Sequence, residues 1–323
     1  MRTTGIHHVT AIAGEPQRNL DFYAGALGVR LVKRTVNFDD PTTYHLYFGD
    51  ATGRPGSILT FFPWAGARAG RHGHGQVGVT SLAIPTASIG YWIQRLISKG
   101  IEYTGPDQRF GEPAIAFPDP DGLTLELVGS DRASKMPAWS GGPVPAEHAI
   151  RGLHAVNMWE EGHAATTDFL TGVMGFRSAG EEGSVRRFAT GDGGPGALVD
   201  VRDTTGFWKG TMGAGAVHHV AWRAADAESQ LAMRAEIVAA GVSATPVIDR
   251  QYFHSVYFNE PGGVLFEIAT DGPGFAIDES PEELGHALKL PPWIEPRRAS
   301  LEEVLPPLHM PGAHPFSGDV ANE

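Results

Sequence analysis

The sequence predicts an α+β fold in which four copies of one short unit build two cupped, barrel-like sheets. Three observations support this. A pattern of strand, helix and further strands recurs four times before about Phe275. Each predicted helix ends at a glycine followed by an apolar residue, a common signal of a helix C-terminus. The 42 glycines and 24 prolines among 323 residues favour short strands and turns over long helices.

The four predicted helices are located by the apolar residues that precede these glycines. The first has the i, i+3, i+4, i+7 spacing of one helix face, at Leu20, Tyr23, Ala24 and Leu27. The second and third repeat this spacing, and the fourth is sparser. The closing glycines, each with the residue that follows, are Gly28-Val29, Gly100-Ile101, Gly175-Phe176 and Gly241-Val242.

A strand-like segment precedes each helix. These segments read IHHVTAI, VTSLAIP, LHAVNMW and VHHVAWRA in chain order. Their matching positions lie between 19 and 22 residues before the closing glycines, at His8, Ser81, Ala155 and His219. Such regular spacing is typical of an internal repeat.

Each unit ends in a turn and an apolar strand. These read PGSILTFFP, DPDGLTLELV, GPGALVDVR and EPGGVLFEIA. Aligned on their turns, the matching positions are Phe61, Glu126, Asp200 and Glu267. One unit cannot close its own sheet, whereas two units side by side can form a cup with fewer exposed edges. Four units therefore predict two cups.

The predicted domain organisation follows the order of the units. An N-terminal pair occupies residues 1–130, a linker 131–150, a C-terminal pair 151–275 and an extension 276–323. The linker is indicated by the run SDRASKMPAWSGGPVP. We expect the extension to pack on the body and to become disordered near Ser317.

Composition excludes several classes of function. The net charge is -12 and no long Lys/Arg run occurs, so we expect neither a nucleic-acid nor a membrane partner. Without cysteine, disulfides, thiolate metal sites and Cys nucleophiles are impossible. The chain has no signal-peptide core and no apolar run of about 18 residues. A cytoplasmic location is the expectation.

The four units differ at the positions that can carry chemistry. The first and fourth provide His8 and His219, and the closing strand of the fourth adds Glu267, where the first has the apolar Phe61. If these two units pair, one cup collects two histidines and one carboxylate. Such a set, with open coordination positions, suits non-haem Fe(II).

Other interpretations of these residues stay open. A histidine on a strand is usually structural. Alternation points one histidine of each HH pair inward without indicating which one. Glu267 lies in an apolar strand, where an unpaired carboxylate is costly. However, Glu126 lies in the same place in a unit without histidine at these positions, so such a glutamate can be structural.

The chain resembles the vicinal oxygen chelate superfamily of glyoxalase and dioxygenase type, whose modules are βαβββ units. Within it, the chain is similar to dioxygenases that open hydroquinone-type rings. The segments that carry this resemblance run from Gly5 to about Phe275 and cover most of the chain. They are GIHHVTAIAG, RLVKRTVNFDDPTTYHLYFGD, SILTFFPW, EHAIRGLHA and HSVYFNEPGGVLFEIATDGPGF.

The resemblance implies an enzyme that cleaves the ring of a dihydroxybenzene with O2. It implies that His8, His219 and Glu267 bind Fe(II), with Mn(II) as an alternative. It also implies that the residues near the metal are His7, Thr10, His218, Arg250 and Tyr257. Arg250 and Tyr257 could equally be surface and core residues. The expected partners are a small aromatic substrate, O2 and, in a homo-oligomer, further copies of the chain.

Two other functions compete with this one. A metal-dependent glyoxalase-like lyase or isomerase would use the same fold, but such enzymes commonly have four protein ligands, and the apolar Phe61 argues against a fourth. Drug-sequestering binders form the second alternative. They are usually short two-module chains without a metal triad, so this chain fits them poorly.

Overall fold

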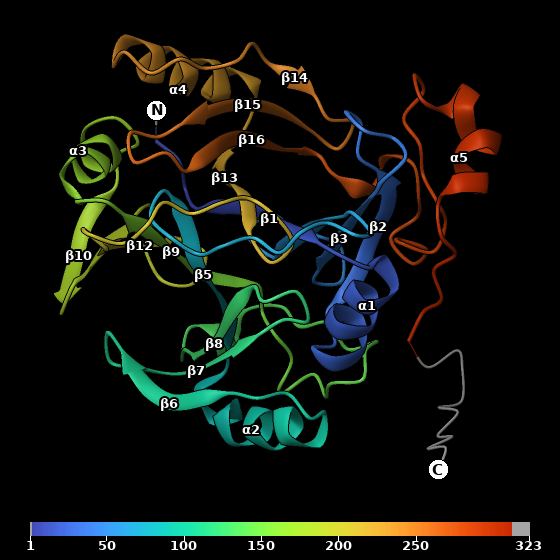
Figure 1. The fold of residues 1–323 in the computed structure, drawn as a ribbon, viewed down its shortest axis with the longest axis horizontal. Helices are drawn as coiled ribbons and strands as arrows, with labels where there is room; N and C mark the ends of the chain where they lie inside the picture. The colour runs from blue at the N-terminus through green and yellow to red at the C-terminus, as the bar shows by residue number, and fades with distance from the viewer. Residues whose placement is uncertain (1, 312–323) are drawn as a thin grey trace.

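The computed structural model describes residues 2–311, which form two eight-stranded sheets and a few helices (Figure 1). Each sheet contains two units of one strand, one helix and three strands, so the predicted α+β fold of four βαβββ modules is confirmed. The first sheet has the order β14-β15-β16-β13-β1-β4-β3-β2. Its strands are β1 (Ile6–Ala13), β2 (Arg30–Val36), β3 (Tyr44–Gly49), β4 (Ile58–Pro63), β13 (Val217–Ala224), β14 (Ile248–Asp249), β15 (Phe253–Asn259) and β16 (Leu265–Pro273).

The second sheet has the order β10-β11-β12-β9-β5-β8-β7-β6. In both sheets the first strand of a unit runs parallel to the last strand of that unit. The strands of the second sheet are β5 (Gln76–Ile84), β6 (Thr104–Arg109), β7 (Glu112–Pro118), β8 (Thr124–Gly129), β9 (Leu153–Glu160), β10 (Arg177–Glu182), β11 (Val185–Ala189) and β12 (Leu198–Asp203).

Each sheet combines one unit from each half of the sequence. The first sheet joins the first and fourth units through antiparallel pairing of β1 with β13, and the second joins the second and third through β5 and β9. The sequence halves 1–130 and 151–275 therefore do not correspond to the two sheets. The boundaries at the 131–150 linker stay a prediction.

The helices lie on the outside of the sheets (Figure 1). At the predicted C-termini, Gly28, Gly100, Gly175 and Gly241 all have φ between 67° and 85°, the left-handed region that favours glycine. The first helix is a short α-helix that continues as a π-helical turn, η1 (Asp21–Ala26). The α-helices of the four units are α1 (Pro16–Leu20), α2 (Ile89–Ser98), α3 (Ala164–Gly172) and α4 (Ala227–Ala239).

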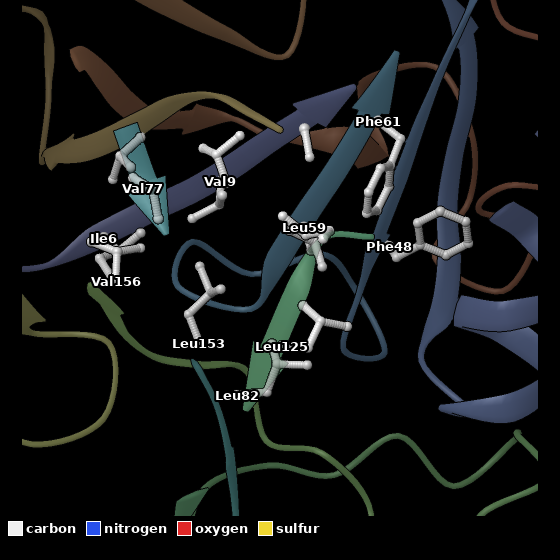
Figure 2. Packing of buried hydrophobic residues seen from close by; sticks show 14 of the residues in the cluster. Ile6, Val9, Phe48, Leu59, Phe61, Val77, Leu82, Leu125, Leu153 and Val156 are labelled. Atoms are coloured by element: carbon white, nitrogen blue, oxygen red, sulfur yellow. The ribbon is translucent and has the colours of Figure 1, made fainter. Parts of the chain in front are cut away.

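A core shared by both sheets holds them together. Ile6 and Val9 of β1 belong to the same buried cluster as Val77 of β5 and Val156 of β9 (Figure 2). Val9 projects from the opposite face of β1 to His8, because successive residues in a strand alternate. The core thus takes one face of β1 and leaves the other to polar side chains.

The extension packs against the edge of the first sheet. Its helix α5 (Arg298–Val304) lies beside β2 (Figure 1). Lys33 of β2 is fully buried, and its ammonium group pairs with Asp278, at 2.6 Å, and with Glu279. The disorder expected near Ser317 lies outside the described residues. No helix within residues 2–311 is long and apolar enough to cross a membrane.

Candidate active site

Two β-bulges shape the centre of the first sheet. The pairing of β1 with β13 slips by one residue at His7 and again at His218, the first histidine of each HH pair. A bulge places an extra residue in one strand and re-aims its side chain. The Nδ1 atoms of the two imidazoles in each pair therefore lie within hydrogen-bond distance of each other. The expectation of one inward histidine per pair holds for His7 and His8, of which His8 alone lines the cavity of the cup, whereas both His218 and His219 line it.

The second histidines converge with the carboxylate of β16. The Nε2 atoms of His8 and His219 are 3.2 Å apart. Oε2 of Glu267 lies 3.4 Å from the first and 3.0 Å from the second. Metal–ligand bonds of about 2.1 Å at right angles would separate neighbouring ligand atoms by about 3 Å. Within the described part of the chain, this is the one group of three such residues close enough to hold an ion.

The first histidines hold the second ones in a defined orientation. Nδ1 of His7 is 2.9 Å from Nδ1 of His8, and Nδ1 of His218 is 2.8 Å from Nδ1 of His219. If the second histidine of each pair donates from Nδ1, its Nε2 carries a lone pair directed at Glu267. Metal-binding histidines usually donate their other ring N–H to a carboxylate, a backbone carbonyl or water, and here the neighbouring imidazole takes that place.

The electrostatics of the triad suit a cation. Burial lowers the pKa of His219, so its imidazole favours the neutral form. Burial would raise the pKa of Glu267, but positive charge beside it, at His8 above all, holds this pKa well below its usual value, and a bound cation would act in the same direction. Oε1 of Glu267 accepts a hydrogen bond from Ser255 at 2.6 Å, while the buried Oε2 has no hydrogen-bond partner. A bound cation would satisfy that oxygen, so the donor set fits a metal ion.

Four equivalent positions face the centre of the cup, one each on β1, β13, β16 and β4. His8, His219 and Glu267 occupy three of them, and a threonine occupies the fourth corner, on β4. In the parallel pairing of β1 with β4, Thr10 lies opposite Thr60, and the equivalent pair in β13 and β16 is Ala221 and Glu267. Thr60 is therefore the structural counterpart of Glu267. The sequence alignment that assigned Phe61 was off by one residue, and Phe61 is buried in the core. The argument against a fourth ligand still holds, because a neutral hydroxyl is a poor substitute for a carboxylate.

A cavity of about 270 Å³ opens beside the triad. Aromatic rings of Phe38, Phe62 and Trp64 line it, together with His8, His219 and His218. Larger cavities occur elsewhere, including one of about 1100 Å³ beside the extension, but the lining of that cavity contains no member of the triad. The smaller cavity is therefore the candidate substrate site.

The other expected site residues divide between the cavity wall and the layer behind it. Arg250 and Tyr257 line the cavity, with the guanidinium over the Tyr257 ring and paired with Asp39 at 3.0 Å. Burial raises the pKa of Tyr257, so the phenol keeps its proton. His7 and Thr10 do not line the cavity, and both are buried behind it.

Sequence reasoning assigned no role to two further residues of the cavity wall, His45 and Tyr47 on β3. They alternate on one face of a strand whose segment, TYHLYF, contains a histidine between two tyrosines. That spacing was an available signal, but no repeat-equivalent histidine drew attention to it.

The second sheet has the same architecture without the metal ligands. Its bulges fall at Gly78 and His154, so Val79, and not Ser81, takes the place of His8. Asp200 is the counterpart of Glu267, and the guanidinium of Arg187 binds it through two hydrogen bonds of 2.7 and 2.8 Å. A fixed cation thus neutralises this carboxylate. Glu126 accepts a hydrogen bond from Ser81, which fits a structural role.

Comparison with known proteins gives a consistent result. A family model described as the Glyoxalase/Bleomycin resistance protein/Dioxygenase superfamily matches residues 5–127 and 152–268. Each matched segment contains two of the four βαβββ units.

Two named relatives match this chain over most of their length. "Putative ring-cleaving dioxygenase MhqO" of Bacillus subtilis (strain 168) is 48% identical over 309 residues, with 96% of this chain and 98% of the relative covered. "Chlorohydroquinone/hydroquinone 1,2-dioxygenase" of Sphingobium indicum is 34% identical over 304 residues, with 91% and 93% covered.

Solved structures agree with the fold. A crystal structure from Bacillus subtilis subsp. subtilis str. 168 superposes with a TM-score of 0.91 at 48% identity, covering 96% of this chain and 98% of that one. Glyoxalase I from Zea mays has a TM-score of 0.61 at 15% identity, covering 83% and 93%, and shares the fold alone.

Proposed function

The chain belongs to the Glyoxalase/Bleomycin resistance protein/Dioxygenase superfamily, and we propose that it is a non-haem Fe(II)-dependent dioxygenase that cleaves the ring of a hydroquinone-type dihydroxybenzene with O2. One observation carries this proposal. His8, His219 and Glu267 present three buried ligand atoms next to an aromatic-lined cavity, with a hydroxyl at the fourth corner. Three ligands on one side leave room for substrate and O2 together.

The proposed metal ligands are His8, His219 and Glu267, and Fe(II) is preferred over Mn(II) because two histidines and one carboxylate with open positions are typical of non-haem Fe(II) oxygenases. Bound iron would supply a Lewis acid that lowers the pKa of a coordinated phenol, together with open positions for O2. His7 would act from behind by fixing the ring of His8 through the 2.9 Å contact. It would not touch the substrate.

Three residues of the cavity wall would orient the substrate. If His218 accepts at Nδ1 from His219, its Nε2 carries the proton and can donate to a ring hydroxyl. Burial lowers the pKa of His218 to about 4, so this neutral form holds at pH 7. Tyr257 keeps its phenolic proton as a second donor, and Arg250 supplies positive charge close to it. The apolar rings around them would exclude water.

A metal-dependent lyase or isomerase on the same fold is the alternative. Thr60 weakens it, because enzymes of that kind commonly have a fourth protein ligand at this corner. The cytoplasmic location, the absence of nucleic-acid and membrane partners, and assembly into a homo-oligomer stay predictions.

Oxygen uptake tests the proposal. The apoprotein would be loaded anaerobically with Fe(II) and mixed with hydroquinone, chlorohydroquinone or catechol in an oxygen-electrode cell. We expect uptake and a new ultraviolet absorption from the ring-opened product with at least one hydroquinone. An iron-replete protein that consumes no oxygen with any of the three would contradict the proposal, and lyase assays with Ni or Zn would follow.

A further inference from the structure

His45 is held rigidly in the wall of the candidate substrate site. It lies on β3, and its ring packs against Tyr47 and Phe62 with ring centroids 4.0 and 4.3 Å away. The ring is half-buried, and it lines the cavity. An imidazole in this position has little freedom to turn, so its two nitrogens keep fixed partners.

Those partners form one continuous chain of hydrogen bonds. Tyr47 Oη lies 2.9 Å from Nδ1 of His45, and Nε2 of His45 lies 2.7 Å from Oγ1 of Thr60. Thr60 Oγ1 lies 2.9 Å from Oγ1 of Thr10. Thr10 is two residues from His8, so its side chain projects from the same face of β1. This series of hydrogen bonds thus runs from Tyr47 in the cavity wall to Thr10, on the face of the sheet that carries the triad.

The direction of donation depends on the outer end of these hydrogen bonds. Within residues 2–311, the partner of the Tyr47 hydroxyl is Nδ1 of His45, and the tautomer of His45 decides which of the two groups donates. With the phenol as the donor, Nδ1 accepts. Burial raises the pKa of Tyr47 and lowers the pKa of His45, which keeps the phenol protonated and the imidazole neutral. A neutral imidazole that accepts at Nδ1 must carry its proton on Nε2.

The consequence extends to the two threonines. Nε2–H of His45 donates to Thr60, whose own proton is then directed to Thr10 Oγ1. The hydroxyl proton of Thr10 is left as the free end of the chain. Neither Thr10 nor Glu267 lines the cavity, so this proton would reach an oxygen atom of substrate or O2 that is bound at the triad itself, behind the cavity wall.

We propose that His45 is a positioning residue: by donating from Nε2, it sets the Thr60 and Thr10 hydroxyls so that Thr10 presents its proton to the reacting oxygens. This inference rests on the proposed dioxygenase function. It also explains the hydroxyl at the fourth corner, where Thr60 acts as a link between His45 and Thr10.

The tautomer of His45 can be measured without metal or substrate. Apoprotein labelled with ¹⁵N-histidine gives two-bond ¹H–¹⁵N correlations that distinguish Nε2–H from Nδ1–H rings, and the His45 signals are those missing in His45→Gln. We expect Nε2–H in the native protein. A His45 ring protonated at Nδ1 would donate to Tyr47 and accept from Thr60, which reverses the direction of the hydrogen bonds and overturns the proposal.

Kinetics then tests the role. His45→Gln places an amide N–H near the position of Nε2, whereas His45→Leu removes the donor. With iron content equal to that of the native enzyme, we expect kcat for hydroquinone to fall about tenfold in His45→Leu, with little change in KM, and to stay within about threefold in His45→Gln. His254→Gln, on β15 and outside the cavity lining, is the matched control and should leave both constants unchanged.

The outcomes separate the two proposals. Equal kcat in the native enzyme, His45→Leu and His45→Gln would refute a positioning role for His45. An equal loss in both variants would show that the donor at Nε2 is not what matters, and would also refute it. If the native enzyme cleaves no dihydroxybenzene, the dioxygenase proposal fails, and with it the catalytic role of His45, while the tautomer measurement still decides the direction of the chain.

Discussion

Replacing Glu267 by Gln should separate metal binding from folding. The substitution keeps the size of the side chain and its contact with Ser255 but removes the charge next to His8 and His219. The folded variant would therefore retain the cup and lose the anionic ligand. We expect it to fold and to gain no stability from Fe(II).

The size of this effect follows from linkage. A ligand that binds only the folded state at one hundred times its dissociation constant adds about 2.7 kcal/mol, and at one thousand times about 4.1 kcal/mol. With an unfolding entropy of about 2.1 cal/mol/K per residue, 1 kcal/mol shifts the Tm of a 323-residue protein by roughly 1.5 °C. Iron should thus raise the Tm of the native protein by about 4–6 °C, and that of Glu267→Gln by less than about 1 °C.

The assay is thermal unfolding followed by circular dichroism under anaerobic conditions, with and without Fe(II). Asp200→Asn is the matched control, because Asp200 takes the place of Glu267 in the second sheet and pairs with Arg187. That variant should lower the Tm of the apoprotein yet keep the full shift with iron. An equal iron shift in Glu267→Gln and in the native protein would refute the assignment of the ligand.

Three further predictions concern residues around and beyond the site. Ser255→Ala removes the hydrogen bond to Glu267 Oε1, so the affinity for Fe(II) should fall about tenfold in competition with a chelator. Burial and the neighbouring Glu260 raise the pKa of Glu160 to about 9, from 4.5 for the free side chain. Between pH 4.5 and about pH 9, Glu160 is ionised in the unfolded chain but keeps its proton in the folded one. The free energy of unfolding therefore falls by about 1.4 kcal/mol for each unit that the pH rises. The glutamine in Glu160→Gln does not titrate, so the Tm of the variant minus the Tm of the native protein should increase from pH 6 to pH 8. If this Tm difference is the same at both pH values, the argument from the burial of Glu160 is wrong. Lys33→Met leaves the carboxylates of Asp278 and Glu279 without their buried cation, which should cost about 3–5 kcal/mol and expose the extension to limited proteolysis.

Much of the architecture could be predicted because it depends on local sequence signals. The four closing glycines indicate helix ends, and all four adopt the positive φ that makes glycine favourable there. The alignment of the units also singled out the two HH pairs and Glu267, and the family resemblance indicated the second histidine of each pair. The fold brings His8, His219 and Glu267 within 3.4 Å of one another. These residues stand at matching places in a repeat, so a spacing argument could find them.

The remaining details depend on how strands pair, which local sequence does not reveal. A bulge at Gly78 moves the register of β5, so the alignment at Ser81 was two residues too late. His7 and His218 are bulged because β1 and β13 slip against each other, and these strands are more than 200 residues apart. The counterpart of His45 in the fourth unit is Ser255, not a histidine, so comparison of the units did not single out His45, which the folded sheet brings near Thr60.

The most direct test of the dioxygenase proposal is the origin of the oxygen atoms in the product. Iron-loaded protein would be mixed with hydroquinone under ¹⁸O2, and the ring-opened product would be analysed at once by mass spectrometry. We predict a product that carries both ¹⁸O atoms, apart from loss by exchange with water, and no product with His219→Ala. A transformed product without ¹⁸O would contradict ring cleavage by a dioxygenase and would favour lyase or isomerase chemistry at the same triad.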